Sequence, residues 1–577
     1  MGYQETYQTW LSDPYFDEAT KEELRAIADD PKEIEERFYM DLEFGTAGLR
    51  GIIGAGTNRM NIYVVRKATQ GLANYIKKQN AQDRGVAIAF DSRHMNTEFA
   101  DCAALCLAAN GIKAYVFESL RPTPELSFAV RYLNCIAGIN ITASHNPADY
   151  NGYKVYWEDG AQITPPHDTG IMAEVQAVTE WADVLTMEKD DAVVADLYQV
   201  IGADIDVPYM EALKSQVLHP EAIKEMAKDL KIVYTPLHGT GNIPARKIMR
   251  QLGFEHVYPV PEQRLPDGDF PTCPYPNPES EDAFVLGLEL AKKIGADLVL
   301  ATDPDADRLG VRVKDAEGNY HDLTGNMSGC LLADYEIGQR KAVKGLPDDG
   351  ALISTIVSSN MAGAIARYYG VDFIEVLTGF KYIGQQILQF EESGKGTYLF
   401  GFEESYGCLI GTHARDKDAI VAVMALCEAA AYYKSQGKTL WEVMIELYER
   451  LGYYKDAIKS IGLAGKEGLE KIQGIMTSFR ENPPAEIGGY KVLATRDYKA
   501  DERVDLATGE KTATGLPSSN VLYYELEDDA WVCVRPSGTE PKIKFYYGIK
   551  GTSLEDADQK SAAMGEQIGA VIDEMLK

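Results

Sequence analysis

The chain has 577 residues, of which 45% are hydrophobic and 25% charged, and its formal net charge at pH 7 is −31. A chain of this length is too long for one hydrophobic core, and the composition is that of a globular enzyme with several domains. The acidic balance excludes nucleic acid as a partner, because a phosphate backbone binds basic surfaces. It leaves room for a small phosphorylated ligand held by a local arginine cluster.

No segment has the pattern of a secretory signal or a membrane helix. The N-terminus lacks a basic start and an apolar core, and the most apolar stretch, Ala419 to Cys427, lies between Asp418 and Glu428. The eight cysteines are scattered and form no CxxC pair. We therefore expect a cytoplasmic protein with buried, reduced thiols and no membrane partner.

Along the first two thirds of the chain, short apolar runs alternate with helix-like stretches. The predicted strands are residues 86–90, 136–141, 231–236, 297–301, 352–357 and 397–402. Such alternation is typical of parallel or mixed sheets that are covered on both faces. Ligands bind beyond the carboxyl ends of strands in these sheets, and the unusual polar residues of this sequence follow those ends.

The last ~110 residues have a different pattern. Four alternating strands and a terminal helix from about Leu554 predict an α+β domain with an antiparallel sheet. We predict an α/β protein with four domains, over residues 1–208, 209–322, 323–450 and 451–577. The Pro-rich segment 267–279 is either an ordered surface loop or a linker.

Thr142-Ala143-Ser144-His145-Asn146-Pro147 directly follows a predicted strand. Ser144, at a tight turn with small neighbours, is a candidate nucleophile, although Ser, Asn and Pro also stabilise turns without any catalytic role. A Ser-His-Asp hydrolase is disfavoured because the G-x-S-x-G pattern is absent. We also expect the side chain of His145 not to point at the neighbouring hydroxyl.

The next candidate site is acidic. Asp303, Asp305 and Asp307 follow a predicted strand at alternate positions, so their carboxylates can converge on a hard cation. An EF-hand calcium loop is excluded, because its glycine and glutamate positions hold Arg308 and Lys314. Mg²⁺ that keeps waters and a phosphoryl oxygen suits so small a ligand set.

Two further segments could bind phosphate. Residues 535–542 contain an arginine, two hydroxyls and a glycine, which could form an anion cradle or a plain hairpin. The glycine-rich run 45–51 is a weaker candidate without the ending of a Walker loop, and Gly239-x-Gly241 lacks the Rossmann fingerprint. Lys154 and Lys381 follow glycine-containing turns. Glu403 and Ser405 could recognise sugar hydroxyls, or finish a strand and cap a helix.

In this order, the motifs resemble those of the α-D-phosphohexomutase family. TASHNP is similar to its phosphoserine loop, DPDADR to its metal loop, GFEES to its sugar-recognition loop and RPSGTEP to its phosphate-binding loop. The motifs span residues 142 to 542. The resemblance implies three related α/β domains with mixed sheets and a C-terminal α+β domain, arranged around a central cleft.

The resemblance also implies a reaction. Ser144 would carry a phosphoryl group to the 6-hydroxyl of glucose 1-phosphate, and the bound glucose 1,6-bisphosphate would return its 1-phosphate to Ser144, giving glucose 6-phosphate. An oxygen of Ser144 and the carboxylates of Asp303, Asp305 and Asp307 would hold Mg²⁺. The remaining catalytic residues would be Arg50, His145 and Lys154, with Lys154 a candidate proton acceptor.

The resemblance assigns substrate contacts as well. Lys381 and Arg308 would contact the phosphosugar substrate, and Glu403 and Ser405 its hydroxyls. The phosphate that is not reacting would be bound by Arg535, Ser537, Gly538 and Thr539.

Two departures from the family pattern concern the substrate. Pro304 and Ala306 separate the aspartates where many relatives have glycine, as in the branch with bacterial phosphoglucomutases, phosphopentomutases and glucose-1,6-bisphosphate synthases. Gly407 stands where the dual-specificity phosphomannomutases have histidine, which disfavours mannose. A mutase for pentose phosphates, a bisphosphate synthase and a metal-dependent sugar phosphatase are the alternatives. The sequence does not predict the oligomeric state.

Overall fold

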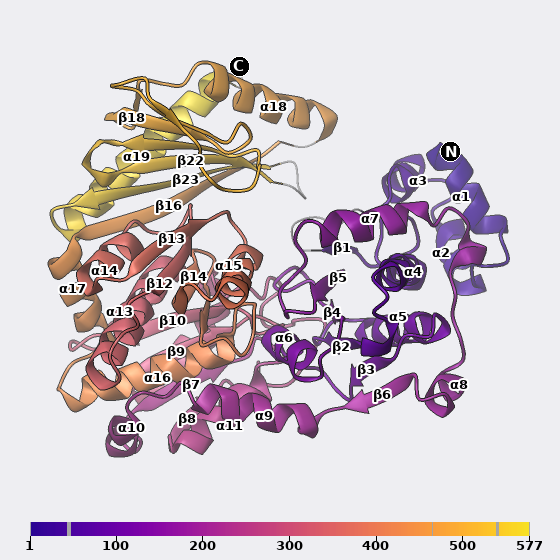
Figure 1. The fold of residues 1–577 in the computed structure, drawn as a ribbon, viewed down its shortest axis with the longest axis horizontal. Helices are drawn as coiled ribbons and strands as arrows, with labels where there is room; N and C mark the ends of the chain where they lie inside the picture. Colours follow the sequence, from indigo (N-terminus) through magenta and orange to yellow (C-terminus); the bar gives the residue numbers. More distant parts are fainter. Residues whose placement is uncertain (1, 43–47, 464, 538–541, 576–577) are drawn as a thin grey trace. The chain divides into compact units, whose positions relative to one another are not determined.

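The computed structural model describes residues 2–42, 48–463, 465–537 and 542–575 (Figure 1). The chain forms two compact units. Unit 1 consists of residues 1–323, 380–394 and 406–439, and unit 2 of residues 324–379, 395–405 and 440–577.

The first sheet of unit 1 is mixed and has six strands in the order β1-β5-β4-β2-β3-β6. Strands β4, β2, β3 and β6 are parallel, whereas β5 is antiparallel to both β4 and β1. Every residue of β2 and β4 is buried, which explains their continuous apolar sequence. The strands are β1 (Leu49–Ile52), β2 (Val86–Phe90), β3 (Ala114–Phe117), β4 (Ala137–Ile141), β5 (Tyr150–Trp157) and β6 (Tyr198–Ile201).

Helices α5 and α6 pack directly on this sheet, and α4 packs between α5 and α7. Asn61 starts α4 by accepting a hydrogen bond from the backbone N–H of Val64, a typical N-cap contact. The helices are α4 (Ile62–Lys78), η1 (Gln82–Arg84), α5 (Asn96–Ala109), α6 (Thr123–Tyr132), α7 (His167–Ala177), η2 (Trp181–Asp183), α8 (Lys189–Val194) and α9 (Ala203–Lys214).

Three short helices precede the first sheet: α1 (Tyr3–Ser12), α2 (Glu18–Ala26) and α3 (Pro31–Phe38). They enclose an aromatic cluster around Trp10, which is fully buried and stacks on Phe16 with ring centroids 4.2 Å apart. Tyr63 of α4 packs edge-on against Trp10 at 5.6 Å. This contact joins the N-terminal helices to the first sheet's helical layer.

The second sheet of unit 1 has the order β11-β10-β9-β7-β8. Strand β7 is parallel to β8 and β9, and β10 is antiparallel to β9 and β11. The elements are α10 (Pro220–Met226), β7 (Lys231–Thr235), α11 (Asn242–Leu252), β8 (His256–Pro259), η3 (Glu281–Phe284), α12 (Val285–Ile294), β9 (Leu298–Thr302), β10 (Leu309–Lys314) and β11 (Tyr320–Leu323).

Unit 1 also contains α15 (Phe380–Ser393), β15 (Gly407–Ile410) and α16 (Ala419–Ser435). Helix α16 is buried on all sides over Ala419 to Ala431 and packs against α10 and α11. The most apolar stretch of the sequence is therefore a core helix. No helix in the described residues is both long and apolar enough to cross a membrane.

Unit 2 combines a parallel sheet with an antiparallel one. In the first, β12 (Gly350–Thr355) lies between β13 (Asp372–Val376) and β14 (Thr397–Glu403). Helices α13 (Gly325–Val343), α14 (Met361–Tyr369) and α17 (Leu440–Leu451) pack around it.

The antiparallel sheet has the order β16-β23-β22-β21-β18-β19-β20, with β17 paired to β18. Helices α18 and α19 pack on it and enclose a core that includes Phe479, Tyr524 and Phe545. The elements are β16 (Tyr453–Gly462), α18 (Gly465–Glu481), β17 (Glu486–Ile487), β18 (Tyr490–Asp497), β19 (Glu502–Asp505), β20 (Lys511–Thr512), β21 (Leu522–Leu526), η4 (Glu527–Asp529), β22 (Trp531–Pro536), β23 (Lys542–Gly551) and α19 (Leu554–Met575).

The predicted fold class is confirmed, because α/β units with mixed sheets precede a C-terminal α+β region. The structure also decides the nature of the Pro-rich segment. Phe270 is fully buried and its ring centroid lies 5.0 Å from the guanidinium of Arg93, while Asp269 contacts His94. Residues 267–279 are therefore an ordered loop packed within unit 1.

Candidate active site

Ser144 lies three residues beyond the end of β4 and is 3% exposed. Its backbone has a φ of 50°, in the left-handed region that non-glycine residues seldom adopt. The N–H of Ser144 donates to Thr142 Oγ1 at 2.8 Å, and Ser144 Oγ donates to Asp303 Oδ2 at 2.7 Å. The fold thus places the predicted nucleophile against the predicted metal loop.

The expectation that His145 would point away from the serine hydroxyl is wrong. Its Nδ1 lies 3.2 Å from Ser144 Oγ. The left-handed backbone of Ser144 turns the chain so that these two neighbouring side chains face each other. Burial, followed by the charges of Arg308 and Arg50, lowers the pKa of His145 well below its usual value, so the imidazole is neutral at pH 7.

Asp303, Asp305 and Asp307 lie between β9 and β10, and all three are buried. One carboxylate oxygen from each fits within 4.8 Å of the others. Oδ1 of Asp305 and Oδ1 of Asp307 are buried and accept no hydrogen bond from the described residues. Buried carboxylate oxygens without donors are costly, and a hard cation would satisfy them. The aspartate triad could therefore hold a metal ion.

The pKa shifts within the triad arise from burial and from the charges of neighbouring side chains. Burial and then the charges of the neighbouring carboxylates raise the pKa of Asp303 well above its usual value, and burial and Asp305 raise that of Asp307. Burial also acts to raise the pKa of Asp305, but the ammonium of Lys154 and several hydrogen bonds reverse this and lower it. Three carboxylates packed this closely need cationic partners.

Two lysines supply part of that charge. Lys154 Nζ lies 2.9 Å from Asp305 Oδ2, and Lys417 Nζ lies 3.2 Å from Asp307 Oδ2. Lys154 belongs to strand β5, so the prediction that it follows a turn is wrong, whereas Lys381 follows the bend at Gly379, whose φ is 117°, and is the second residue of helix α15. Lys154 pairs with Asn140 of β4, the strand that leads into the serine loop.

The loop after β7 packs against the loop that carries the three aspartates. Both the N–H and Oγ1 of Thr240 donate to the carbonyl of Pro304, at 2.8 and 2.9 Å. A Cβ at Gly239 would lie 2.3 Å from the Cα of Pro304. The glycine is thus required by close backbone packing, and this glycine-containing segment packs against the loop that carries the three aspartates.

Sequence reasoning missed several polar residues around the site. Thr123, the first residue of α6, donates to Asp305 Oδ2 at 2.8 Å, and Asp91 accepts from Thr142 Oγ1 at 2.6 Å. Arg93 and Lys417 were also not predicted as site residues. The signal available was the position of Asp91 and Arg93 directly after β2.

The other predicted residues of unit 1 lie as follows. Arg50, on β1, donates from Nη1 to Asn146 Oδ1 at 3.0 Å, beside the serine loop. Arg308 donates from Nη1 to Glu279 Oε1 at 2.7 Å. Burial lowers the pKa of Lys381. Their substrate contacts stay predictions.

Unit 2 carries the remaining predicted residues. Ser405 Oγ donates to Glu403 Oε1 at 2.8 Å, just where β14 ends. Arg535 is the fifth residue of β22 and faces Lys544 of β23, and the N–H of Ser537 donates to the carbonyl of Lys542 at 2.7 Å. Gly538 and Thr539 lie outside the described residues, as does part of the run 45–51.

The charges of Glu403, at the end of β14, and of Arg535, on β22, both act on the carboxyl group of Glu404. Its Oε2 accepts from Thr355 Oγ1 at 3.0 Å. Burial and then the charge of Glu403 raise the pKa of Glu404 to about 7, against the opposing effects of Thr355 and Arg535. A raised pKa means that folding favours the protonated carboxyl.

We expect Glu404→Gln to stabilise the protein at pH 8 and to have little effect below pH ~4.5. The stability that protonated Glu404 provides is present at low pH and is lost as the pH rises through about 7. For a partly exposed side chain we expect a difference on the order of 2 kcal/mol. Thermal unfolding at both pH values measures it. The exposed Glu481→Gln is the control, and an equal gain at both pH values would contradict the expectation.

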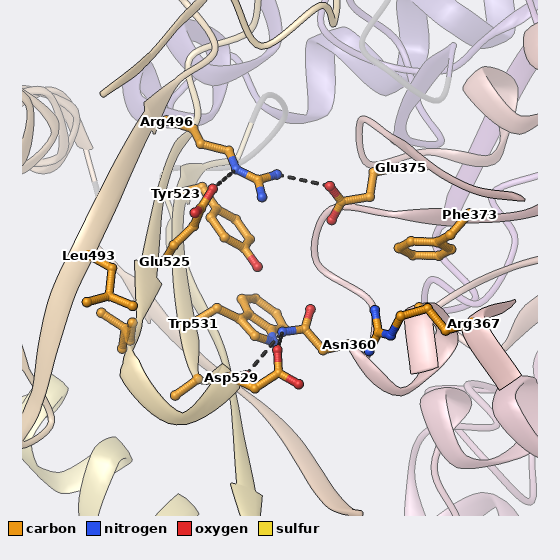
Figure 2. Close-up of a pocket in the computed structure, with 13 residues that line it drawn as sticks. Asn360, Arg367, Phe373, Glu375, Leu493, Arg496, Tyr523, Glu525, Asp529 and Trp531 are labelled. Atoms are coloured by element: carbon orange, nitrogen blue, oxygen red, sulfur yellow. Dashed lines mark hydrogen bonds and ion pairs between the residues drawn. The ribbon is translucent and has the colours of Figure 1, made fainter. Parts of the chain in front are cut away.

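A separate pocket of about 310 Å³ lies within unit 2, between the C-terminal sheet and the segments around α14 and β13 (Figure 2). Arg496 bridges Glu375 and Glu525 across one end, and Asn360 donates to Asp529 at the other. Among the residues that line it, none is a predicted site residue. The pocket therefore does not belong to the candidate active site.

Known proteins share both the sequence pattern and the fold. Residues 41–181, 207–318 and 324–451 match α/β/α domains I, II and III of phosphoglucomutase/phosphomannomutase. Phosphoglucomutase from Staphylococcus aureus strain MRSA252 is 39% identical over 537 residues, covering 92% of this chain and 94% of the relative. Phosphoglucomutase from Staphylococcus epidermidis is 39% identical over 534 residues with the same coverage.

Two solved structures show the same fold. One is the exocytosis-sensitive phosphoprotein pp63/parafusin, a phosphoglucomutase from Paramecium, with a TM-score of 0.67, 19% identity and coverage of 93% of this chain and 96% of that chain. The other is a phosphoglucomutase/phosphomannomutase family protein from Burkholderia thailandensis, with a TM-score of 0.64, 19% identity and coverage of 92% and 98%.

The matched domains and relatives define an enzyme of intramolecular phosphoryl transfer. The chain belongs to the phosphoglucomutase/phosphomannomutase family. It is accordingly a phosphohexomutase, and the resemblance stated from the sequence is confirmed.

Proposed function

We propose that this enzyme interconverts glucose 1-phosphate and glucose 6-phosphate through a phosphorylated Ser144 and a glucose 1,6-bisphosphate intermediate. The observation that carries the proposal is the hydrogen bond of 2.7 Å from Ser144 Oγ to Asp303 Oδ2, which sets a candidate phosphoryl carrier against a candidate cation site. The 39% identity with staphylococcal phosphoglucomutases supports the choice of glucose.

The reaction consists of two transfers of opposite sense. In the first, the bond from phosphorus to Ser144 Oγ breaks as the 6-hydroxyl of glucose 1-phosphate forms a new bond to phosphorus; the 6-hydroxyl loses its proton and Ser144 Oγ takes one up. In the second, the bond from phosphorus to the 1-oxygen of the bisphosphate breaks as Ser144 Oγ forms a new bond to that phosphorus; Ser144 Oγ loses its proton, the 1-oxygen takes one up, and glucose 6-phosphate leaves. Phosphoryl transfer depends on in-line positioning and on neutralising the oxygens of the transferred group.

The aspartate triad fits a magnesium site, since two of its buried oxygens accept no hydrogen bond from any residue that the structure describes. Asp303, Asp305 and Asp307 would hold Mg²⁺ together with an oxygen of Ser144 or of its phosphoryl group. The bound cation would neutralise charge on the phosphoryl oxygens.

The basic residues near Ser144 have complementary roles. Lys154 would accept the proton of the substrate hydroxyl, and Lys417, paired with Asp307, is a second lysine beside the triad. Arg50, which contacts the serine loop through Asn146, would bind oxygens of the transferred group. Neutral His145 would hold the hydroxyl of unmodified Ser144 at 3.2 Å.

Substrate recognition would involve residues of both units. Glu403 and Ser405 would bind sugar hydroxyls, and Lys381 and Arg308 would contact the phosphosugar. Arg535 and Ser537, with Gly538 and Thr539, would bind the phosphate that is not reacting.

We also keep the proposed domain boundaries near 208, 322 and 450, which the ranges of the three matched family domains support. A cytoplasmic location is supported by the eight cysteines. All lie within the described residues, are buried and form no disulfide, a state that a reducing compartment maintains.

Substrate preference tests this proposal. With catalytic glucose 1,6-bisphosphate, kcat/KM for glucose 1-phosphate should exceed those for mannose 1-phosphate and ribose 1-phosphate by roughly 5- to 150-fold, since an unpaired polar group costs ~1–3 kcal/mol. Glu403→Ala should lower kcat/KM for both glucose 1-phosphate and mannose 1-phosphate and should reduce the ratio between the two values. A clear preference for ribose 1-phosphate would assign a phosphopentomutase, and release of inorganic phosphate at the rate of turnover would assign a phosphatase.

A further inference from the structure

We propose that Arg93, together with Asp91, is a positioning element that holds Ser144 in line for phosphoryl transfer. The inference rests on the proposed role of Ser144 as the phosphoryl carrier. Neither residue contacts the hydroxyl itself, so both would act through the backbone of the serine loop.

The guanidinium of Arg93 binds one short stretch of backbone. Its Nη2 donates to the carbonyls of Ser144, at 2.6 Å, and of Asn146. Its Nη1 donates to the carbonyls of Pro147 and Tyr150, at 2.6 and 3.0 Å. Four carbonyls within seven residues therefore converge on one side chain.

Asp91 holds the same loop from its other end. Its Oδ2 accepts from Thr142 Oγ1 at 2.6 Å, and Thr142 Oγ1 in turn accepts from the N–H of Ser144 at 2.8 Å. Its Oδ1 accepts from the backbone N–H of Arg93 at 3.0 Å, and the two side chains form an ion pair of 3.5 Å. We call Asp91, Arg93 and Thr142 the serine-loop brace.

The brace is buried. The side chains of Asp91 and Arg93 are both 0% exposed, and Phe270 covers the guanidinium with its ring centroid at 5.0 Å. A planar guanidinium can direct four N–H groups at four carbonyls at once, whereas an ammonium has three donors and no plane. The geometry thus requires arginine and not merely a positive charge.

The loop needs such support because of its conformation and its chemistry. Ser144 adopts φ 50°, which costs on the order of 1 kcal/mol for a residue with a Cβ and must be held in place by its surroundings. Its oxygen alternates between leaving group and nucleophile, and both transfers require alignment to about 0.5 Å. A loose loop would bind sugar phosphates normally and transfer the phosphoryl group slowly.

The test is the conservative variant Arg93→Lys, studied as the full chain. Rapid-quench measurement of label passing from labelled glucose 1,6-bisphosphate to Ser144 should be slower by about 100-fold. The KM for glucose 1-phosphate should stay within about threefold of the wild-type value, because substrate contacts are intact. Amide exchange over residues 142–150 should accelerate in the variant.

Arg84→Lys is the matched control. Arg84 also donates to backbone carbonyls, those of Asn134 and Cys135 in the loop that precedes β4, each at 3.2 Å. It lies outside the candidate active site. We expect its labelling rate to stay within about threefold of wild type. If Arg84→Lys slows labelling as much as Arg93→Lys, the effect is a general loss of structure and the inference is wrong.

Thr142→Val provides a second test and carries the decision if Arg93→Lys does not fold. It is nearly isosteric and removes the oxygen that joins Asp91 to Ser144, so labelling should slow by about 10-fold or more at an unchanged KM. Normal labelling in a folded brace variant would overturn the positioning role alone. Failure of the wild-type enzyme to become labelled at Ser144 would instead overturn the proposed function.

Discussion

Ser144→Ala should reduce mutase activity by about 10⁴-fold or more while the protein stays folded. Removal of a nucleophile that forms a covalent intermediate abolishes both transfers, and such losses reach about 10⁶-fold in well-studied enzymes. The structural cost should be small, since the change deletes one hydroxyl that donates to Asp303 Oδ2. We expect a loss of ~1–2 kcal/mol in the free energy of unfolding.

Steady-state assays and intact-mass spectrometry check this expectation together. Wild-type protein incubated with glucose 1,6-bisphosphate should gain the mass of one phosphate on the peptide that contains Ser144, and the variant should not. Ser328→Ala is the control, because it removes another buried serine hydroxyl, in α13, that donates to the carbonyl of Gly325 at 3.2 Å. An active alanine variant, or phosphate at a different serine, would end the phosphoserine hypothesis.

The candidate site residues that the sequence indicates belong to local patterns. Ser144 and the three aspartates follow buried strands, where the chain must turn and where α/β sheets bind ligands. Their order and spacing can be read within a few residues. The hydrogen bond of 2.7 Å between Ser144 and Asp303, which are 159 positions apart in the sequence, follows only from the fold.

The missed residues depend on long-range packing. Lys417 contacts Asp307 from 110 positions away, and Thr123 contacts Asp305 from 182 positions away. Neither stands in a pattern that distinguishes it from an ordinary surface lysine or helix start. His145 was misjudged because a positive φ at Ser144 cannot be read from a non-glycine residue.

The fold was predictable where burial is complete. Residues 86–90, buried throughout, form β2 with the predicted bounds. The N-terminal helices were not predicted, because α2 and α3 are short and highly charged and are stabilised by the aromatic cluster around Trp10. The place of α16 in unit 1 was also unpredictable, since an apolar helix has no preferred face.

Removal of metal should inactivate the enzyme, and addition of Mg²⁺ should restore its activity. In Asp307→Asn, most of the activity should be lost and Mg²⁺ should not restore it. Chelated wild-type enzyme should recover on addition of Mg²⁺, which should also raise its unfolding temperature. At 100 times the dissociation constant, a ligand specific to the folded state contributes ~2.7 kcal/mol. In Asp307→Asn we expect Mg²⁺ affinity and kcat/KM to fall by about 100-fold or more, because a small site depends on each anionic ligand.

The stability of the metal-free variant separates this explanation from simple damage to the fold. Asp307 is buried beside two other carboxylates, so removing its charge relieves electrostatic repulsion. The two lysines stay paired, Lys154 with Asp305 and Lys417 with Asp416. Metal-free Asp307→Asn should therefore unfold at a temperature no lower than metal-free wild type. Asp297→Asn is the control, since Asp297 also pairs with two lysines, Lys314 and Lys434, but lies outside the triad. It should leave the Mg²⁺ response intact. Full activity of metal-stripped wild-type enzyme, or an undiminished thermal response to Mg²⁺ in Asp307→Asn, would show that the triad is not the metal site.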